Sequence, residues 1–249
     1  MRAFGKSRGF TLVELMAAMA VSAVVLLGAA MLLSETLDHH ERTSNRVSVH
    51  ENARIGWNQL RADLEASVSH REAVFECPDT DWPRARLGMF RLLTDEMQQE
   101  EQRVADLGAV HYYLEDLTLQ GKTVRCLMRG VRGSVDTFSA LKEGETAELF
   151  VKRPVFDEPV MIGVMSFWVE PKRWLSGWVG WTRENESLPE ALEVRVVAVS
   201  PRLAARLGNP ADWNGEGRFL KMLGRPEDAA SNPDFEVFSA IFPLGGHGK

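Results

Sequence analysis

Apolar residues dominate the first part of the chain. Between Phe10 and Leu33 the sole charged residue is Glu14, and the run from Leu15 to Ser34 holds 20 uncharged residues. A helix of that length spans about 30 Å, which matches the hydrocarbon core of a bilayer. The pattern predicts a membrane-spanning helix near the N-terminus.

The apolar positions then continue as a stripe along a helix. Proline is absent for more than thirty residues after Ser34, and good helix formers dominate. We expect one long helix from about Thr11 to about Val68, whose second half lies on a globular domain. Gly28 and Gly56 are each expected to lower the stability of the helix by about 1 kcal/mol relative to alanine. The stripe consists of Ala53, Trp57, Leu60, Leu64 and Val68, at steps of four, three, four and four.

Beyond Cys77-Pro78 the period of the apolar positions falls toward two, which is typical of strands. Gly121-Lys122 lies between two such runs and predicts a hairpin turn. The expected fold class is α+β, with a mainly antiparallel sheet packed on the long helix. The expected elements are strands at Leu87–Leu93, Ala109–Leu114, Thr123–Met128, Ala147–Val151, Val160–Val169, Gly177–Trp181, Ala191–Ser200 and Phe235–Phe242, short helices at Asp95–Val104 and Pro201–Leu207, and a long loop from Gly208 to Asp234.

Composition and charge exclude several classes of function. The chain has 249 residues, ample for a hydrophobic core, and 29 Lys and Arg against 35 Asp and Glu, a net charge of −6. That balance argues against non-specific nucleic-acid binding, which needs clustered cations. The two cysteines are too few for a zinc ribbon.

Three interpretations compete for the N-terminal segment. A cleaved secretory signal has a shorter apolar core followed by a small-residue cleavage site, and Ala29-Ala30 keeps that interpretation open. A plain membrane anchor explains the length but not Glu14, because a carboxylate in a membrane helix costs about 2.5–3.5 kcal/mol and calls for a partner. The third interpretation explains both features.

The sequence Gly9-Phe10-Thr11-Leu12-Val13-Glu14, preceded by a basic leader, resembles the processing motif of type IV prepilins and pseudopilins. The resemblance implies that a prepilin peptidase cuts between Gly9 and Phe10 and methylates the Phe10 amine. It also implies that Glu14 pairs with the N-terminal amine of a neighbouring subunit during filament assembly. Opposite charges in a low-dielectric bundle attract strongly, whereas either one alone is penalised.

This resemblance implies a division of the chain and a location. Residues 1–9 are a leader, 10–34 a transmembrane and assembly helix, 35–70 its amphipathic continuation, and 71–249 a β-rich periplasmic domain. The basic leader orients the single span with its N-terminus in the cytoplasm. We expect a protein of the inner membrane that later enters a filament in the cell envelope.

The C-terminal half carries a second resemblance, to J-type minor pseudopilins of type II secretion and to related pilin-like cassette proteins. The J-type resemblance rests on Met165–Glu170, on the tryptophans that follow, on Leu188–Val197 and, outside this half, on Trp57–Leu64. The resemblance to cassette proteins rests on Leu188–Leu207. The J-type resemblance implies a minor subunit at or near a filament tip, which aids assembly initiation or contacts secreted cargo. This chain is longer than a usual J-type subunit.

Four tryptophans, Trp168, Trp174, Trp178 and Trp181, fall within fourteen residues. Strand alternation and core filling explain the cluster simply. The alternative is a partner surface, because indole rings offer large faces at low entropic cost. The sequence also leaves open whether Cys77 and Cys126 form a disulfide in the oxidising periplasm.

Catalytic and metal-binding motifs are lacking. Glu76, Asp79 and Asp81 lack the glycine and distal glutamate of an EF-hand, and His39-His40 reads as solvated helix surface. We therefore expect no enzymatic activity, metal or cofactor.

The leading hypothesis is a minor pilin or pseudopilin. Its expected partners are the prepilin peptidase, other pilin subunits, the inner membrane and secreted protein cargo, and not nucleic acid. The alternative is a membrane-anchored periplasmic binding or enzymatic domain that never polymerises.

Overall fold

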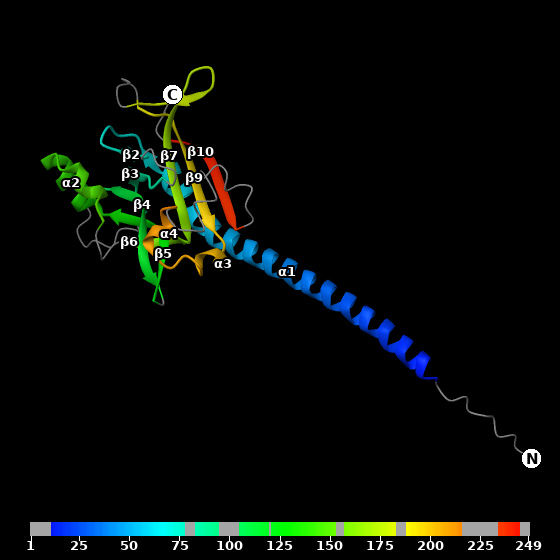
Figure 1. The fold of residues 1–249 in the computed structure, drawn as a ribbon. Coiled ribbons are helices and arrows are strands. Elements are labelled where there is room, and N and C mark those ends of the chain that lie inside the picture. Colours follow the sequence, from blue (N-terminus) through cyan, green and yellow to red (C-terminus); the bar gives the residue numbers. More distant parts are fainter. Residues whose placement is uncertain are drawn as a thin grey trace, which may run out of the picture. The chain divides into compact units, whose positions relative to one another are not determined.

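The computed structural model describes residues 11–77, 83–94, 105–119, 121–152, 157–182, 188–215 and 234–244 (Figure 1). The chain forms two compact units, residues 1–44 and 45–249. The elements in chain order are α1 (Leu12–Glu65), β1 (Ser67–Val68), β2 (Val74–Glu76), β3 (Arg86–Leu92), β4 (Leu107–Leu119), β5 (Lys122–Arg132), α2 (Ser134–Glu143), the 3-10 helix η2 (Thr146–Phe150), β6 (Asp157–Ile162), β7 (Val164–Trp174), β8 (Trp178–Gly180), β9 (Ala191–Val199), α3 (Pro201–Ala204), α4 (Pro210–Trp213) and β10 (Phe235–Pro243).

The described residues of the second unit form two antiparallel sheets. One has six strands in the order β1-β3-β4-β5-β6, with β2 also paired to β3. The other has the order β10-β9-β7-β8, and its three long strands lie side by side in Figure 1. The expected α+β class, with a long helix and mainly antiparallel strands, is confirmed.

One core joins the C-terminal part of α1 to both sheets. Ala53, Leu60 and Leu64 are fully buried, and they cluster with apolar side chains of β3, β4, β5, β7 and β9. Trp57 is half-buried and packs on Phe242 of β10, with ring centroids 5.3 Å apart. The predicted stripe is therefore the buried face of α1, although its last member is wrong. Val68 lies outside the helix, in β1, and is exposed.

Gly56 has a packing role that helix propensity alone does not predict. A Cβ at this position would lie 2.6 Å from the Val160 carbonyl oxygen and 3.0 Å from the Met161 Cβ. Such distances are shorter than van der Waals contact, so any side chain would push α1 away from β6. Glycine here permits the close approach of helix and sheet.

The expected single strand Val160–Val169 is wrong, because Gly163 divides it into β6 and β7. Gly163 has φ +76°, a left-handed conformation that favours glycine. Its N–H donates to the Arg125 carbonyl of one sheet, and its carbonyl accepts from Val199 of the other, at 2.9 and 2.8 Å. The chain thus passes from the first sheet to the second at this residue.

The expected strand at Ala147–Val151 is also wrong. The 3-10 helix η2 occupies this segment and buries Leu149 and Phe150 against Phe90 and Ala109. Two adjacent apolar residues reach one core from a tight turn, whereas a strand would point them to opposite faces.

The remaining turns, short helices and loops agree with the sequence prediction in part. The turn at Gly121, with φ +78°, joins β4 and β5 as expected. Helix α2 was not expected, although Gly144 supplies its left-handed C-terminal cap at φ +75°. The loop from Gly208 contains α4, whose capping box pairs Asn209 with Asp212. The helix expected at 95–104 and residues 216–233 of that loop lie outside the described residues.

Candidate functional site

Glu14 lies in the first turn of α1 and forms a capping box with Thr11. The Glu14 carboxylate accepts hydrogen bonds from the Thr11 N–H and hydroxyl at 3.0 and 2.9 Å. The Glu14 N–H in turn donates to the Thr11 hydroxyl oxygen at 3.3 Å. This reciprocal pair satisfies N–H groups that a helix start otherwise leaves without partners. The Thr-x-x-Glu spacing in the sequence is the signal from which this capping box could be predicted.

The carboxylate of Glu14 is exposed in the single chain, with partners from its own turn. Gly9 and Phe10, the expected cleavage and methylation residues, lie outside the described residues.

The segment from Leu12 to Leu37 is the one described stretch long and apolar enough to cross a membrane. All its described side chains are exposed. Apolar surface of this extent requires lipid or other helices to remove it from water.

A buried ionic cluster fixes the C-terminal part of α1 on the first sheet. Its centre is Asp63, which is fully buried. The carboxylate accepts bonds from Arg129 Nε at 2.7 Å, from the Tyr112 hydroxyl at 2.6 Å, and from Arg91 Nη1. Burial, together with the Asp63 charge, raises the pKa of Tyr112 well above its ordinary value, so the phenol stays a donor. Sequence periodicity could not reveal this cluster, since its partners come from three distant strands.

A second buried cluster centres on Asp157 at the start of β6. Arg132 Nη1 donates to its carboxylate at 2.8 Å, the Tyr113 hydroxyl at 3.0 Å, and His111 Nε2 lies 3.2 Å away. Burial lowers the pKa of His111 to about 4, although the Asp157 charge opposes this shift. His111 is therefore neutral at pH 7.

An aspartate–histidine pair also occurs in acid–base catalysis, but here the ring has no room for a substrate. A Cβ on Gly130 would lie 2.2 Å from His111 Cε1 and 2.8 Å from Nδ1. The ring also stacks on Tyr113, with centroids 5.2 Å apart. The His111 and Asp157 side chains are 3% and 1% exposed, so protein surrounds the pair and leaves it out of reach of a substrate.

The four tryptophans do not form one surface. Trp174 and Trp178 face each other across the β7–β8 hairpin, with ring centroids 5.2 Å apart, and are 54% and 38% exposed. Leu175 at the tip of the hairpin is also exposed. Trp168 and Trp181 are half-buried, Trp168 paired with Arg195 in the sheet and Trp181 edge-on to Phe75. Of the four tryptophans, the two at the hairpin tip, Trp174 and Trp178, are therefore the exposed ones.

Both cysteines are thiols in the structure. Cys126 is fully buried in β5, and this burial raises the pKa of its thiol to about 11. Cys77 is half-buried after β2. The bridge that the sequence left open is not formed here.

No group of three His, Cys, Asp or Glu residues in the described part of the chain could hold a metal ion. Of the three acidic residues compared with an EF-hand, Glu76 has its Oε2 3.8 Å from Arg86 Nη1, and Asp79 and Asp81 lie outside the described residues.

Comparison with known families identifies the N-terminal segment. Residues 5–30 match the model of the prokaryotic N-terminal methylation motif. The chain carries a prepilin-type N-terminus. This supports the type IV pilin and pseudopilin superfamily, and it implies processing by a prepilin peptidase and association with pilin subunits. Neither a curated protein nor a solved structure matches the chain.

Proposed function

We propose that this chain is a minor pilin or pseudopilin, cut between Gly9 and Phe10, methylated on Phe10 and incorporated at or near the tip of a filament. The observation that carries the proposal is the methylation motif at residues 5–30, continued by an apolar helix whose described side chains are all exposed. The filament is a type II secretion pseudopilus or a type IV pilus-like fibre, in which the subunit starts assembly or contacts cargo.

The apolar helix is stable where lipid or other helices keep its surface out of water. In the inner membrane, acyl chains cover Leu12–Leu37, and the basic leader keeps the N-terminus in the cytoplasm. In a filament, neighbouring helices replace the acyl chains, so apolar surface stays out of water throughout. The Glu14 carboxylate, bonded to Thr11 in the single chain, exchanges these bonds for the methylated amine of a neighbour.

The first test is intact-protein and N-terminal peptide mass spectrometry of native material. The proposal expects an N-terminus at Phe10 that carries one methyl group. Gly9→Ala should leave a precursor heavier by residues 1–9, whereas Gly5→Ala, a leader glycine outside the scissile bond, should be processed normally. An intact Met1 end in the unmodified protein, or a terminus near Ala30, contradicts the proposal.

The second test separates a filament subunit from a plain anchor. Glu14→Gln keeps the volume of the side chain and removes its charge. The proposal expects normal insertion and cleavage but poor recovery in sheared filaments, with loss of crosslinks between neighbours at Leu12. A variant that behaves like the parent in all three measurements supports an anchored domain that does not polymerise.

The tip position draws on the second unit. The J-type resemblance covers β7, the β7–β8 hairpin and β9, and the hairpin presents Trp174, Leu175 and Trp178 to solvent. Exposed aromatic residues are typical centres of protein contacts. Trp178→Ser should weaken co-purification with the other minor subunits or with cargo, and Phe138→Ser, at an equally exposed position on α2, should not. Equal recovery from both variants contradicts a partner surface at the hairpin.

A further inference from the structure

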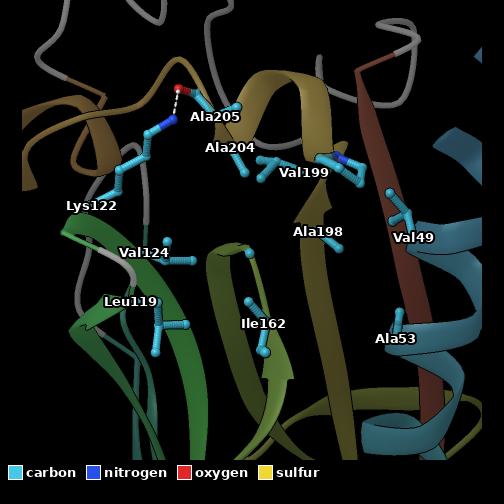
Figure 2. Close-up of a pocket in the computed structure, with 12 residues that line it drawn as sticks. Val49, Ala53, Leu119, Lys122, Val124, Ile162, Ala198, Val199, Ala204 and Ala205 are labelled. Carbon is cyan, nitrogen blue, oxygen red and sulfur yellow. Dashed lines mark hydrogen bonds between the residues drawn. The ribbon is translucent and has the colours of Figure 1, made fainter.

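The second unit contains an apolar pocket that no part of the proposed function uses. Its volume is about 540 Å³. Figure 2 shows that α1, the β4–β5 hairpin, the turn after β6, the end of β9 and the α3 segment all contribute to it. Val49 of α1, Val124 of β5 and Ile162 of β6 are among its lining residues, and Ile162 is 44% exposed.

One charged side chain lies at this pocket. Of the twelve described residues that line it, eleven are apolar or glycine, and the twelfth is Lys122. Its Nζ reaches the Ala205 carbonyl oxygen at 3.4 Å, a long bond that leaves the other ammonium hydrogens for a ligand (Figure 2). Arg202 in α3 and Arg206 just after it are exposed, so the segment that lines the pocket is basic although the chain carries a net charge of −6.

We infer that the pocket binds one acyl chain of an anionic membrane lipid, whose phosphate group pairs with Lys122. Small-molecule pockets typically have about 300–1,000 Å³, an apolar lining and few polar groups. A partner helix has a diameter of about 10 Å and is much wider than an acyl chain. An acyl chain is one methylene wide and demands no hydrogen bonds from the lining.

The length of chain between the pocket and the apolar segment sets an upper limit on the distance between them. Val49 follows Leu37, the last residue of the apolar segment, by twelve residues. Even fully extended, twelve residues span at most about 40 Å. The source of the lipid thus rests on the proposed membrane insertion of this segment. The head group is identified by charge complementarity, because anionic lipids attract clustered Lys and Arg.

The experiment uses the full chain in vesicles of phosphatidylcholine alone and of phosphatidylcholine with phosphatidylglycerol. The labelled lipid is phosphatidylcholine in the first kind of vesicle and phosphatidylglycerol in the second, and it carries a photoactivatable group on its acyl chain. Adducts are mapped by peptide mass spectrometry. Adducts in 12–37 report membrane insertion in either lipid. The inference expects further adducts in 119–124 and 198–205, enriched with the anionic probe.

Two substitutions with matched controls make the result specific. Lys122→Gln should lower labelling of the pocket peptides about fivefold with the anionic probe, while Lys142→Gln on α2 leaves it unchanged. Ala205→Trp, at an exposed rim position, should abolish that labelling, while Ala211→Trp, exposed on α4, should not.

The outcomes separate this inference from the proposed function. Adducts in 12–37 without adducts at the pocket overturn the lipid site and leave membrane insertion intact. Pocket adducts that respond neither to head-group charge nor to Lys122→Gln overturn the assigned chemistry. If Ala205→Trp instead blocks filament assembly and leaves lipid labelling unchanged, the pocket holds protein and the inference is wrong.

Discussion

Replacing Asp63 by alanine tests whether the ionic cluster fixes α1 to the first sheet. The substitution removes the carboxylate that accepts bonds from Arg91, Arg129 and Tyr112 and leaves both guanidinium groups buried. Breaking a buried ion pair in this way costs about 3–5 kcal/mol. A domain is typically stable by about 5–15 kcal/mol, so the loss is a large fraction of the total.

The assay is urea unfolding of the full chain in a mild detergent, followed by tryptophan fluorescence. Asp63→Ala should lower the free energy of unfolding by about 4 kcal/mol. Glu65→Ala is the matched control two residues away, because its pair with Arg61, at 2.7 Å, is exposed on both sides. That pair should contribute about 0.5 kcal/mol.

A compensated variant distinguishes the charge imbalance from lost packing. Asp63→Leu combined with Arg91→Met and Arg129→Met replaces the whole cluster by apolar side chains. Such replacements are often neutral, so the triple variant should recover much of the lost stability. A loss below 1 kcal/mol for Asp63→Ala, or a triple variant less stable than the single one, would refute the reasoning.

Three further outcomes are expected. Gly56→Ala should lower the free energy of unfolding by about 1–3 kcal/mol in urea unfolding, because its Cβ would meet β6. Gly28→Ala should not lower it, since no described atom lies within 4 Å and alanine is the better helix former by about 1 kcal/mol. The free energy of unfolding should fall by about 2 kcal/mol from pH 7 to pH 5, because the unfolded chain protonates His111 near pH 6.5 while the native pKa of His111 is about 4. A His111→Gln variant whose free energy of unfolding changes equally with pH contradicts this prediction. In Ellman titration of the native protein, Cys77 should react and Cys126 should not until the protein unfolds, and a count of zero thiols after unfolding would indicate a bridge.

The long N-terminal helix and its motif could be predicted from the sequence, because both depend on residues that are close together along the chain. A basic leader, a glycine, a glutamate at a fixed spacing and an uncharged run all lie within about thirty-five residues of one another. The apolar stripe of α1 was equally visible, since a period near 3.6 places its members on one face without reference to other elements.

The sheets were harder to derive. Gly163 carries no local signal that distinguishes a turn between two sheets from a glycine within one strand. The turn depends on Arg125 and Val199 of different sheets, whose backbone groups form hydrogen bonds with the N–H and the carbonyl of Gly163. In the sequence, Phe150 fits the pattern of a strand. In the structure, its ring fills the space that Gly88 of β3 leaves by having no side chain.

The sequence by itself determined that this chain has a membrane-compatible helix with one carboxylate at its start, because helix period, hydropathy and motif spacing depend on neighbours along the chain. The tertiary structure alone decided which charges are buried, which tryptophans are exposed and where a pocket forms. Those properties depend on residues that are distant in sequence and meet only when the strands pair. Asp63 shows the difference: it is one more polar residue on a helix until three strands surround it with two arginines and a tyrosine.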